Sequence, residues 1–169
     1  MILTLDTVSP LPEFSLIEDN KIIFTKKIIE NTSQKMSDSI IEKYQKLENE
    51  YLIEKKIKSL VVNTGPGSYT ALRIGISFLS GLSISKNLSL IGIPCISLFS
   101  YEVLSSNLIS TAYLIYSSNK QKYICIYDPI KKFHKINKIS TNKDLTILNK
   151  KKINKILTNT NMEKEELDF

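Results

Sequence analysis

The chain has 169 residues, of which 42% are hydrophobic and 24% charged, and a formal net charge of +6. This length suits one domain, or two small lobes, with a core that needs no disulfides. Cys95 and Cys125 lie in apolar runs without a CxxC pair, and there is a single histidine, which argues against a disulfide framework and a zinc site. There is no signal-peptide pattern and no apolar run near the roughly 18 residues that cross a membrane. We therefore expect a cytoplasmic protein with no membrane contact.

The positive charge is concentrated toward the end of the chain. Residues 130–169 carry ten lysines against five acidic residues, while the rest of the chain is almost balanced. A basic tail can attract nucleic acid. Because the whole chain is rich in Ile, Lys and Asn, we favour a solvated surface of biased composition over a dedicated nucleic-acid patch.

Three short strands are expected at the start, over residues 2–7, 13–18 and 21–27. Asp19-Asn20, between the second and the third, is a turn signal typical of a hairpin. The first part of the sheet should therefore be antiparallel.

A helix should follow, capped by Ser33 or Ser37 and running to about residue 51. Its apolar residues recur at helical spacing and form a single stripe: Met36, Ile40, Ile41, Tyr44 and Leu47. Strands and helices then alternate, which favours parallel strand pairing with right-handed crossovers. The expected elements are a strand at 60–63, a helix at 69–85, a strand at 88–93, a helix at 97–106, a hairpin of 112–117 and 123–127, a strand at 133–139 and a frayed helix at 151–157.

All five glycines of the chain and its only arginine lie between residues 65 and 92. The turn Gly65-Pro66-Gly67-Ser68 joins a strand to a helix, with Thr70 and Arg73 just beyond it. Gly65 can adopt a positive φ, Gly67 allows close backbone approach, and Ser68 can cap the helix.

The spacing of this turn does not fit either nucleotide fingerprint. A phosphate-binding loop needs Gly-Lys, and a dinucleotide loop needs glycine, where this chain has Thr70. Free amides at the start of a helix also favour anions. We favour a tight structural turn over an anion site.

The helix expected after the turn is apolar on almost every side. A helix of this kind must be covered on two faces. A partner protein could cover the second face, helped by the small residues that let another helix approach. The chain's own sheet and first helix could equally cover it, and both alternatives stay open on the residues alone.

Candidates for chemistry are few. Asp6 and Thr7 end the first strand, where a carboxylate could hold Mg²⁺ near a nucleotide or could simply be a turn residue, which we favour. His134 is isolated in a lysine-rich stretch, so no nucleophilic set, catalytic residue or metal site is predicted.

Three segments together resemble the TsaB (YeaZ) family: ILTLDT at residues 2–7, VNTGPGSYTALRIGIS at residues 62–77 and IGIPCISL at residues 91–98. The resemblance covers about residues 1–128. It implies an α/β, actin-like fold (ASKHA, ribonuclease H-like), with a mixed sheet, flanking helices and a reduced second lobe. We expect an N-terminal lobe over 1–106 and a short C-terminal lobe with a lysine- and asparagine-rich tail over 107–169.

The resemblance also implies a function. Members of the family are non-catalytic partners of TsaD in forming threonylcarbamoyladenosine (t6A) beside the anticodon of tRNAs that read ANN codons. It implies a heterodimer with a TsaD-like protein, association with a TsaE-like ATPase, and indirect contact with tRNA. ATP and Mg²⁺ are implied for the complex, and no cofactor is assigned to this chain.

In the family, two helices form the partner interface. The matching residues here, for a TsaD-like partner or for a second copy, are Met36, Ile40, Tyr44, Leu47, Ile76, Phe78, Leu79 and Leu82. Arg73 would clamp a partner carboxylate or hold a carbonyl of its own loop. Two departures from the family pattern are Ala71, where glycine is usual, and the absence of a histidine at the start of the first helix.

Two rival hypotheses belong to other classes. The chain could be an active nucleotide-binding ATPase that uses Asp6 and the glycine turn on Mg-ATP. It could also be a homodimeric interaction module that uses the same two helices.

Overall fold

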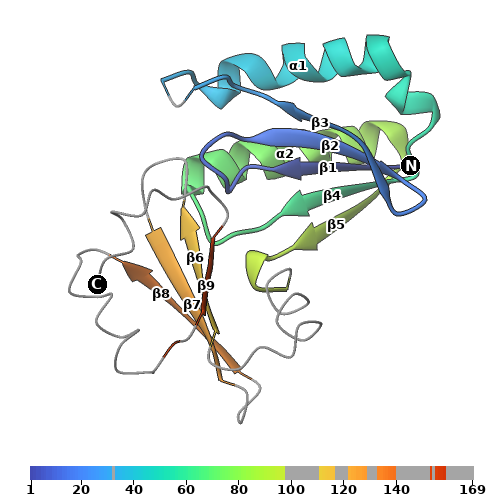
Figure 1. Cartoon of the computed structure of the whole chain (residues 1–169). Helices are drawn as coiled ribbons and strands as arrows, with labels where there is room; N and C mark the ends of the chain where they lie inside the picture. The colour runs from blue at the N-terminus through green and yellow to red at the C-terminus, as the bar shows by residue number, and fades with distance from the viewer. Residues whose placement is uncertain are drawn as a thin grey trace.

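The computed structural model describes residues 1–31, 33–97, 111–116, 122–128, 133–139, 153 and 155–158. Two sheets organise these residues (Figure 1). We call the first sheet with its helices the first lobe, and the second sheet the second lobe.

The sheet of the first lobe has five strands in the order β3-β2-β1-β4-β5. β1 pairs antiparallel with β2 and parallel with β4, and β4 pairs parallel with β5. The predicted mixed sheet is therefore confirmed. Its strands are β1 (Ile2–Asp6), β2 (Glu13–Glu18), β3 (Lys21–Lys27), β4 (Ser59–Asn63) and β5 (Ser89–Ile93).

The predicted β2–β3 hairpin is also confirmed. Asp19 and Asn20 both take left-handed conformations, with φ of 49° and 61°. These are residue types that tolerate the left-handed conformation in two-residue hairpin turns.

Two helices cover one face of this sheet, α1 (Met36–Tyr51) and α2 (Tyr69–Lys86), with a short 3-10 helix, η1 (Ile53–Lys55), after α1 (Figure 1). The alternation of β1 turns Leu3 and Leu5 toward the helices. The core joins them to Phe14 and Leu16 of β2, Leu60 and Val62 of β4, and the buried faces of both helices.

The two helices begin differently. At the start of α2, Ser68 accepts a hydrogen bond from the amide of Ala71 (3.4 Å), as predicted. The predicted serine cap of α1 is wrong, because the cap position is Lys35 and no side chain of a described residue bonds there. The hydroxyls of Ser33 and Ser37 bond instead to Asn31 and Asp38.

The second lobe is a four-stranded sheet in the order β8-β7-β6-β9. β7 pairs antiparallel with β6 and β8, which confirms the predicted hairpin and the following strand. Its strands are β6 (Thr111–Tyr116), β7 (Lys122–Asp128), β8 (Phe133–Ile139) and β9 (Lys155–Thr158).

The helix predicted at 151–157 is wrong, because its second half is β9. This strand pairs parallel with β6 and completes that edge of the sheet. Ile153 and Ile156 pack against Ala112, Leu114, Ile124 and Ile126. Burial of β-branched residues and ladder hydrogen bonds outweigh a weak helical pattern here.

Other sequence predictions fall partly or wholly outside the described residues. The helix predicted from Ser97 already has helical residues at 95–97, so Ser97 does not cap it, and the rest of the predicted helix lies outside. The proposed lobe boundary at 106/107 and most of the lysine-rich tail also lie outside. No helix among the described residues is long and apolar enough to cross a membrane.

Candidate functional site

The carboxyl ends of the parallel strands form a closed polar network. Asp6 ends β1, and its carboxylate accepts hydrogen bonds from the Val8 amide (2.9 Å), the Ser9 hydroxyl (2.6 Å) and the Asn63 side-chain amide (3.0 Å). The side-chain oxygen of Asn63, at the end of β4, accepts in turn from the Gly65 amide (3.0 Å) and the Cys95 thiol (3.2 Å). The network ties the ends of β1 and β4 to the turns that follow the strands.

In this network Asp6 acts as a turn residue, the alternative that the sequence favoured. Thr7 is fully buried, and its hydroxyl has no hydrogen-bond partner among the described residues. A vestigial magnesium role for Asp6 and Thr7 gains no support from this geometry. In the described part of the chain, no three His, Cys, Asp or Glu side chains gather into a metal site.

The glycine turn has the predicted local geometry. Gly65, two residues after Asn63, takes φ of 98°. Its carbonyl accepts a hydrogen bond from the Cys95 amide (2.9 Å). A Cβ on Gly67 would lie 3.2 Å from a methyl group of Val8. The peptide between Gly65 and Pro66 is cis. Hydrogen bonds to neighbouring strands and loops make this a tight structural turn, and Thr70 lies exposed beyond it.

Both cysteines behave as small buried side chains. Burial raises the pKa of the Cys95 thiol to about 11, and it raises that of Cys125 to about 12. Both thiols therefore stay protonated at neutral pH, which agrees with a packing role.

One face of α2 lies against the sheet. Ala71, Gly75 and Leu79 are spaced four residues apart and are buried. A Cβ on Gly75 would lie only 2.6 Å from the methyl carbon of Thr7. Gly75 thus allows α2 to approach the end of β1 closely.

The opposite face of α2 carries exposed aromatic, cationic and aliphatic side chains. Tyr69 is 71% exposed, Ile76 36% and Ile84 83%. The guanidinium of Arg73 lies over the Tyr69 ring, 5.3 Å from its centre. At 3.6 residues per turn these four residues fall on one side of the helix. We call Tyr69, Arg73, Ile76 and Ile84 the α2 stripe.

The residues predicted for the partner interface differ in how exposed they are in this chain. The buried residues among those predicted for the interface are Met36, Ile40, Tyr44, Leu47 and Leu79. Phe78 and Leu82 are partly buried against the same core, and Ile76 is exposed. Four of the five residues in the predicted α1 stripe face the chain's own sheet, while Ile41 is exposed. One face of α2 also lies against the sheet.

The exposed residues of α2 could have been found from their spacing in the sequence. A helix that is apolar all round has a second apolar face. Arg73 lies four residues after Tyr69, and Ile76 three residues further on, so helical spacing places all three on one face. Choosing the most apolar positions, as the prediction did, selects the core face instead.

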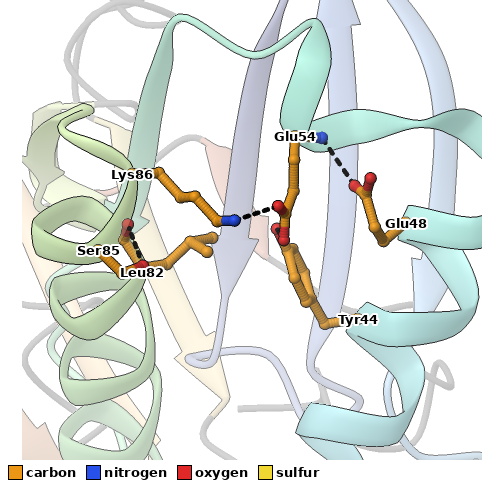
Figure 2. Close-up of polar contacts among 6 residues, drawn as sticks. All are labelled: Tyr44, Glu48, Glu54, Leu82, Ser85 and Lys86. Carbon is orange, nitrogen blue, oxygen red and sulfur yellow. Dashed lines mark hydrogen bonds and ion pairs between the residues drawn. The ribbon is translucent and has the colours of Figure 1, made fainter.

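A polar contact fixes the far ends of α1 and α2 (Figure 2). Lys86, at the end of α2, forms an ion pair with Glu54 in η1. The Tyr44 hydroxyl of α1 lies 3.5 Å from the same carboxylate, and the Glu54 amide donates to Glu48 (2.7 Å). Burial and the nearby Glu54 raise the pKa of Tyr44 above its ordinary value, so the phenol stays neutral. This contact links η1 to α1 and to the end of α2.

The two mixed sheets, with α1 and α2 on one face of the first, define an actin-like α/β fold. YeaZ from Pseudomonas aeruginosa matches it with a TM-score of 0.55 at 13% identity, over 80% of this chain and 63% of that one. An uncharacterized protein similar to the peptidase YeaZ from Pseudomonas aeruginosa matches with a TM-score of 0.57 at 15% identity, over 80% and 62%. The chain thus spans less than two thirds of either structure.

The family follows from the sequence itself. The model of the TsaD family, described as tRNA N6-adenosine threonylcarbamoyltransferase, matches residues 27–167. The chain belongs to this family. The predicted resemblance to a TsaB-like protein is confirmed, by the TsaD family match and by the fold shared with YeaZ. None of the curated proteins matches the chain.

Proposed function

We propose that this chain is a non-catalytic partner of a TsaD-like protein and supports formation of t6A in tRNAs that read ANN codons. The family match and the YeaZ-like fold support a place in this modification. The observation that carries the partner role is the exposed α2 stripe.

The composition of the α2 stripe is typical of a protein interface. Interface centres are enriched in tyrosine and arginine and in well-packed apolar contacts. Ile84, at 83% exposure, is a large aliphatic side chain that gains from burial. A Cβ on Gly81 would meet no atom of the described residues within 4 Å, so a partner helix has room to approach there.

Arg73 gives this surface an electrostatic preference. Its guanidinium is oriented by the Tyr69 ring and presents donors that suit a carboxylate. We therefore assign it the first of its two predicted roles, a clamp on an acidic side chain of the partner.

The polar network supports a non-catalytic role. The carboxylate of Asp6 is held by three donors within the chain. Transfer of the threonylcarbamoyl group, with ATP and Mg²⁺, would belong to the TsaD-like protein and the TsaE-like ATPase of the complex. Titration of the isolated chain with Mg-ATP tests the rival ATPase hypothesis, which requires tight 1:1 binding.

Sedimentation velocity with the TsaD-like protein of the same organism tests the interface. The wild-type mixture should sediment as a heterodimer, and Ile84→Glu should weaken the complex at least tenfold, because it places a charge in the apolar contact. Ile22→Glu is the matched control, since Ile22 is 67% exposed on the edge strand β3.

Two results would count against this assignment. Equal binding by wild type and Ile84→Glu would remove the α2 stripe from the interface. A wild-type chain that forms a stable homodimer, and does not exchange it for the TsaD-like protein, would favour the homodimeric module instead.

A further inference from the structure

The start of α2 is held by both lobes. On the first-lobe side, the turn before it is fixed through Asn63 and Cys95. On the second-lobe side, the hydroxyl of Tyr123 in β7 donates a hydrogen bond to the carbonyl of Gly67 (3.3 Å). Figure 1 shows this end of α2 as the end nearer to the second sheet.

An apolar contact accompanies this hydrogen bond. Leu72, in the first turn of α2, packs with side chains from both lobes. The cluster consists of Val8, Cys95 and Ile115, which are buried, with Leu72, Tyr113 and Tyr123 packed against them. The second lobe therefore shares an apolar cluster with the flank of α2 and also contacts the turn before it.

These contacts lie directly beside the α2 stripe. Gly67 precedes Ser68, whose hydroxyl caps the helix, and Tyr69 follows at once. Leu72 and Arg73 are neighbours in sequence and project on adjacent sides of the same turn. A change in the direction of this turn would therefore displace the Tyr69 ring and the Arg73 guanidinium together.

We propose that Tyr123 is a positioning residue of the partner-binding surface. Its hydrogen bond to Gly67 lets the second lobe fix the first turn of α2 in the orientation that presents Tyr69 and Arg73 to the partner. The binding part of this inference rests on the proposed function.

The first test is Tyr123→Phe, which removes one hydroxyl and keeps the ring in the cluster. The affinity for the TsaD-like protein, measured by isothermal titration, should fall about threefold to tenfold, the range expected for one hydrogen bond. Tyr51→Phe is the control, because Tyr51 lies at the end of α1 and packs on Phe24. Unchanged affinity in Tyr123→Phe would overturn the proposal.

A double-mutant cycle separates positioning from a general loss of stability. In an Arg73→Ala background the effect of Tyr123→Phe on affinity should shrink by at least half, because the group that it positions is gone. Fully additive losses would contradict the proposal even if each single variant binds more weakly.

Hydrogen exchange in the free protein tests the positioning without a partner. Tyr123→Phe should raise exchange at the amides of residues 71–75 by about threefold to tenfold and leave those of α1 unchanged. If the wild type does not bind the TsaD-like protein, the proposed function fails while this readout still decides the structural claim. No change in exchange at 71–75 would overturn that claim.

Discussion

Thr7 illustrates how a single residue links the end of β1 to α2. It is fully buried between the sheet and α2, and within the part of the chain that the structure describes its hydroxyl is unpaired. A buried polar group without a partner destabilises the folded state. From sequence, Asp6-Thr7 looked like a pair with possible magnesium chemistry. In the structure the Asp6 carboxylate accepts hydrogen bonds within the turn, and the Thr7 side chain packs in the core. These roles depend on tertiary contacts, which the sequence does not show.

Thr7→Val should therefore stabilise the protein. Replacing the unpaired hydroxyl by a methyl group removes a desolvation cost of about 1 kcal/mol. Urea denaturation should show this gain, and the Tm should rise by roughly 2–4 °C. Thr25→Val is the control, because the Thr25 hydroxyl is paired with Ser15 (2.9 Å). A less stable Thr7→Val protein would mean that the hydroxyl has a partner.

Glu13 makes the stability depend on pH. Burial raises the pKa of its carboxyl above 4.5, with a further rise from the Asp6 carboxylate and a smaller opposing effect of Lys27. The charged form is therefore less favourable in the folded state than in the unfolded chain. Ionisation of Glu13 therefore destabilises the fold as the pH rises above the ordinary pKa of 4.5 and through the raised pKa of the folded state.

Glu13→Gln should accordingly raise the Tm at pH 7. The gain should disappear as the pH falls below 4.5, the ordinary pKa of the carboxyl, because both proteins are then neutral at this position. Thermal unfolding of the two proteins between pH 3 and 7 measures the difference. A difference that stays constant over this range would contradict the assigned cause.

At the scale of elements, α2 packs one face against the sheet and leaves the other exposed. Its existence, its start at Ser68 and its glycine turn could be predicted, because capping and turn residues act locally. The exposed face is harder to predict, because apolar residues such as Ile76 and Ile84 lie on it as well. The small residues Ala71 and Gly75 take the core face because α2 lies close to β1 there.

The close approach at Gly75 gives a prediction at this scale. Gly75→Ala should destabilise the protein by about 1–3 kcal/mol, because its Cβ would lie 2.6 Å from a carbon of Thr7. Gly81→Ala, in open space on the same helix, should be neutral or stabilising through helix propensity. Chemical denaturation compares the two. Equal effects of both changes would mean that α2 does not lie this close to β1.

β9 illustrates the limit of local patterns in the second lobe. Lys155–Thr158 follows a lysine-rich stretch with a weak helical period, yet it pairs with β6. That pairing is between residues some forty positions apart in sequence, so no local signal reports it. The β6–β7 hairpin, by contrast, joins neighbouring segments and could be predicted.

At the scale of the molecule, each lobe contributes to one surface. The first lobe builds α2 and closes the strand ends with the network around Asp6. The second lobe contacts the turn before α2 through Tyr123, and its Ile115 shares an apolar cluster with Leu72 of α2. The fold class could be inferred from the TsaB-like motifs, whereas this contact between lobes could not, because it joins residues far apart in the chain.

The central claim is that the α2 stripe supports tRNA modification by binding a TsaD-like protein. The most direct measurement is the t6A content of tRNA, by mass spectrometry of nucleosides, in cells of the source organism depleted of this chain and complemented with variants. Wild type and Ile22→Glu should restore t6A, and Ile84→Glu, expressed at equal level, should not. Full restoration by Ile84→Glu, or unchanged t6A after depletion, would contradict the account.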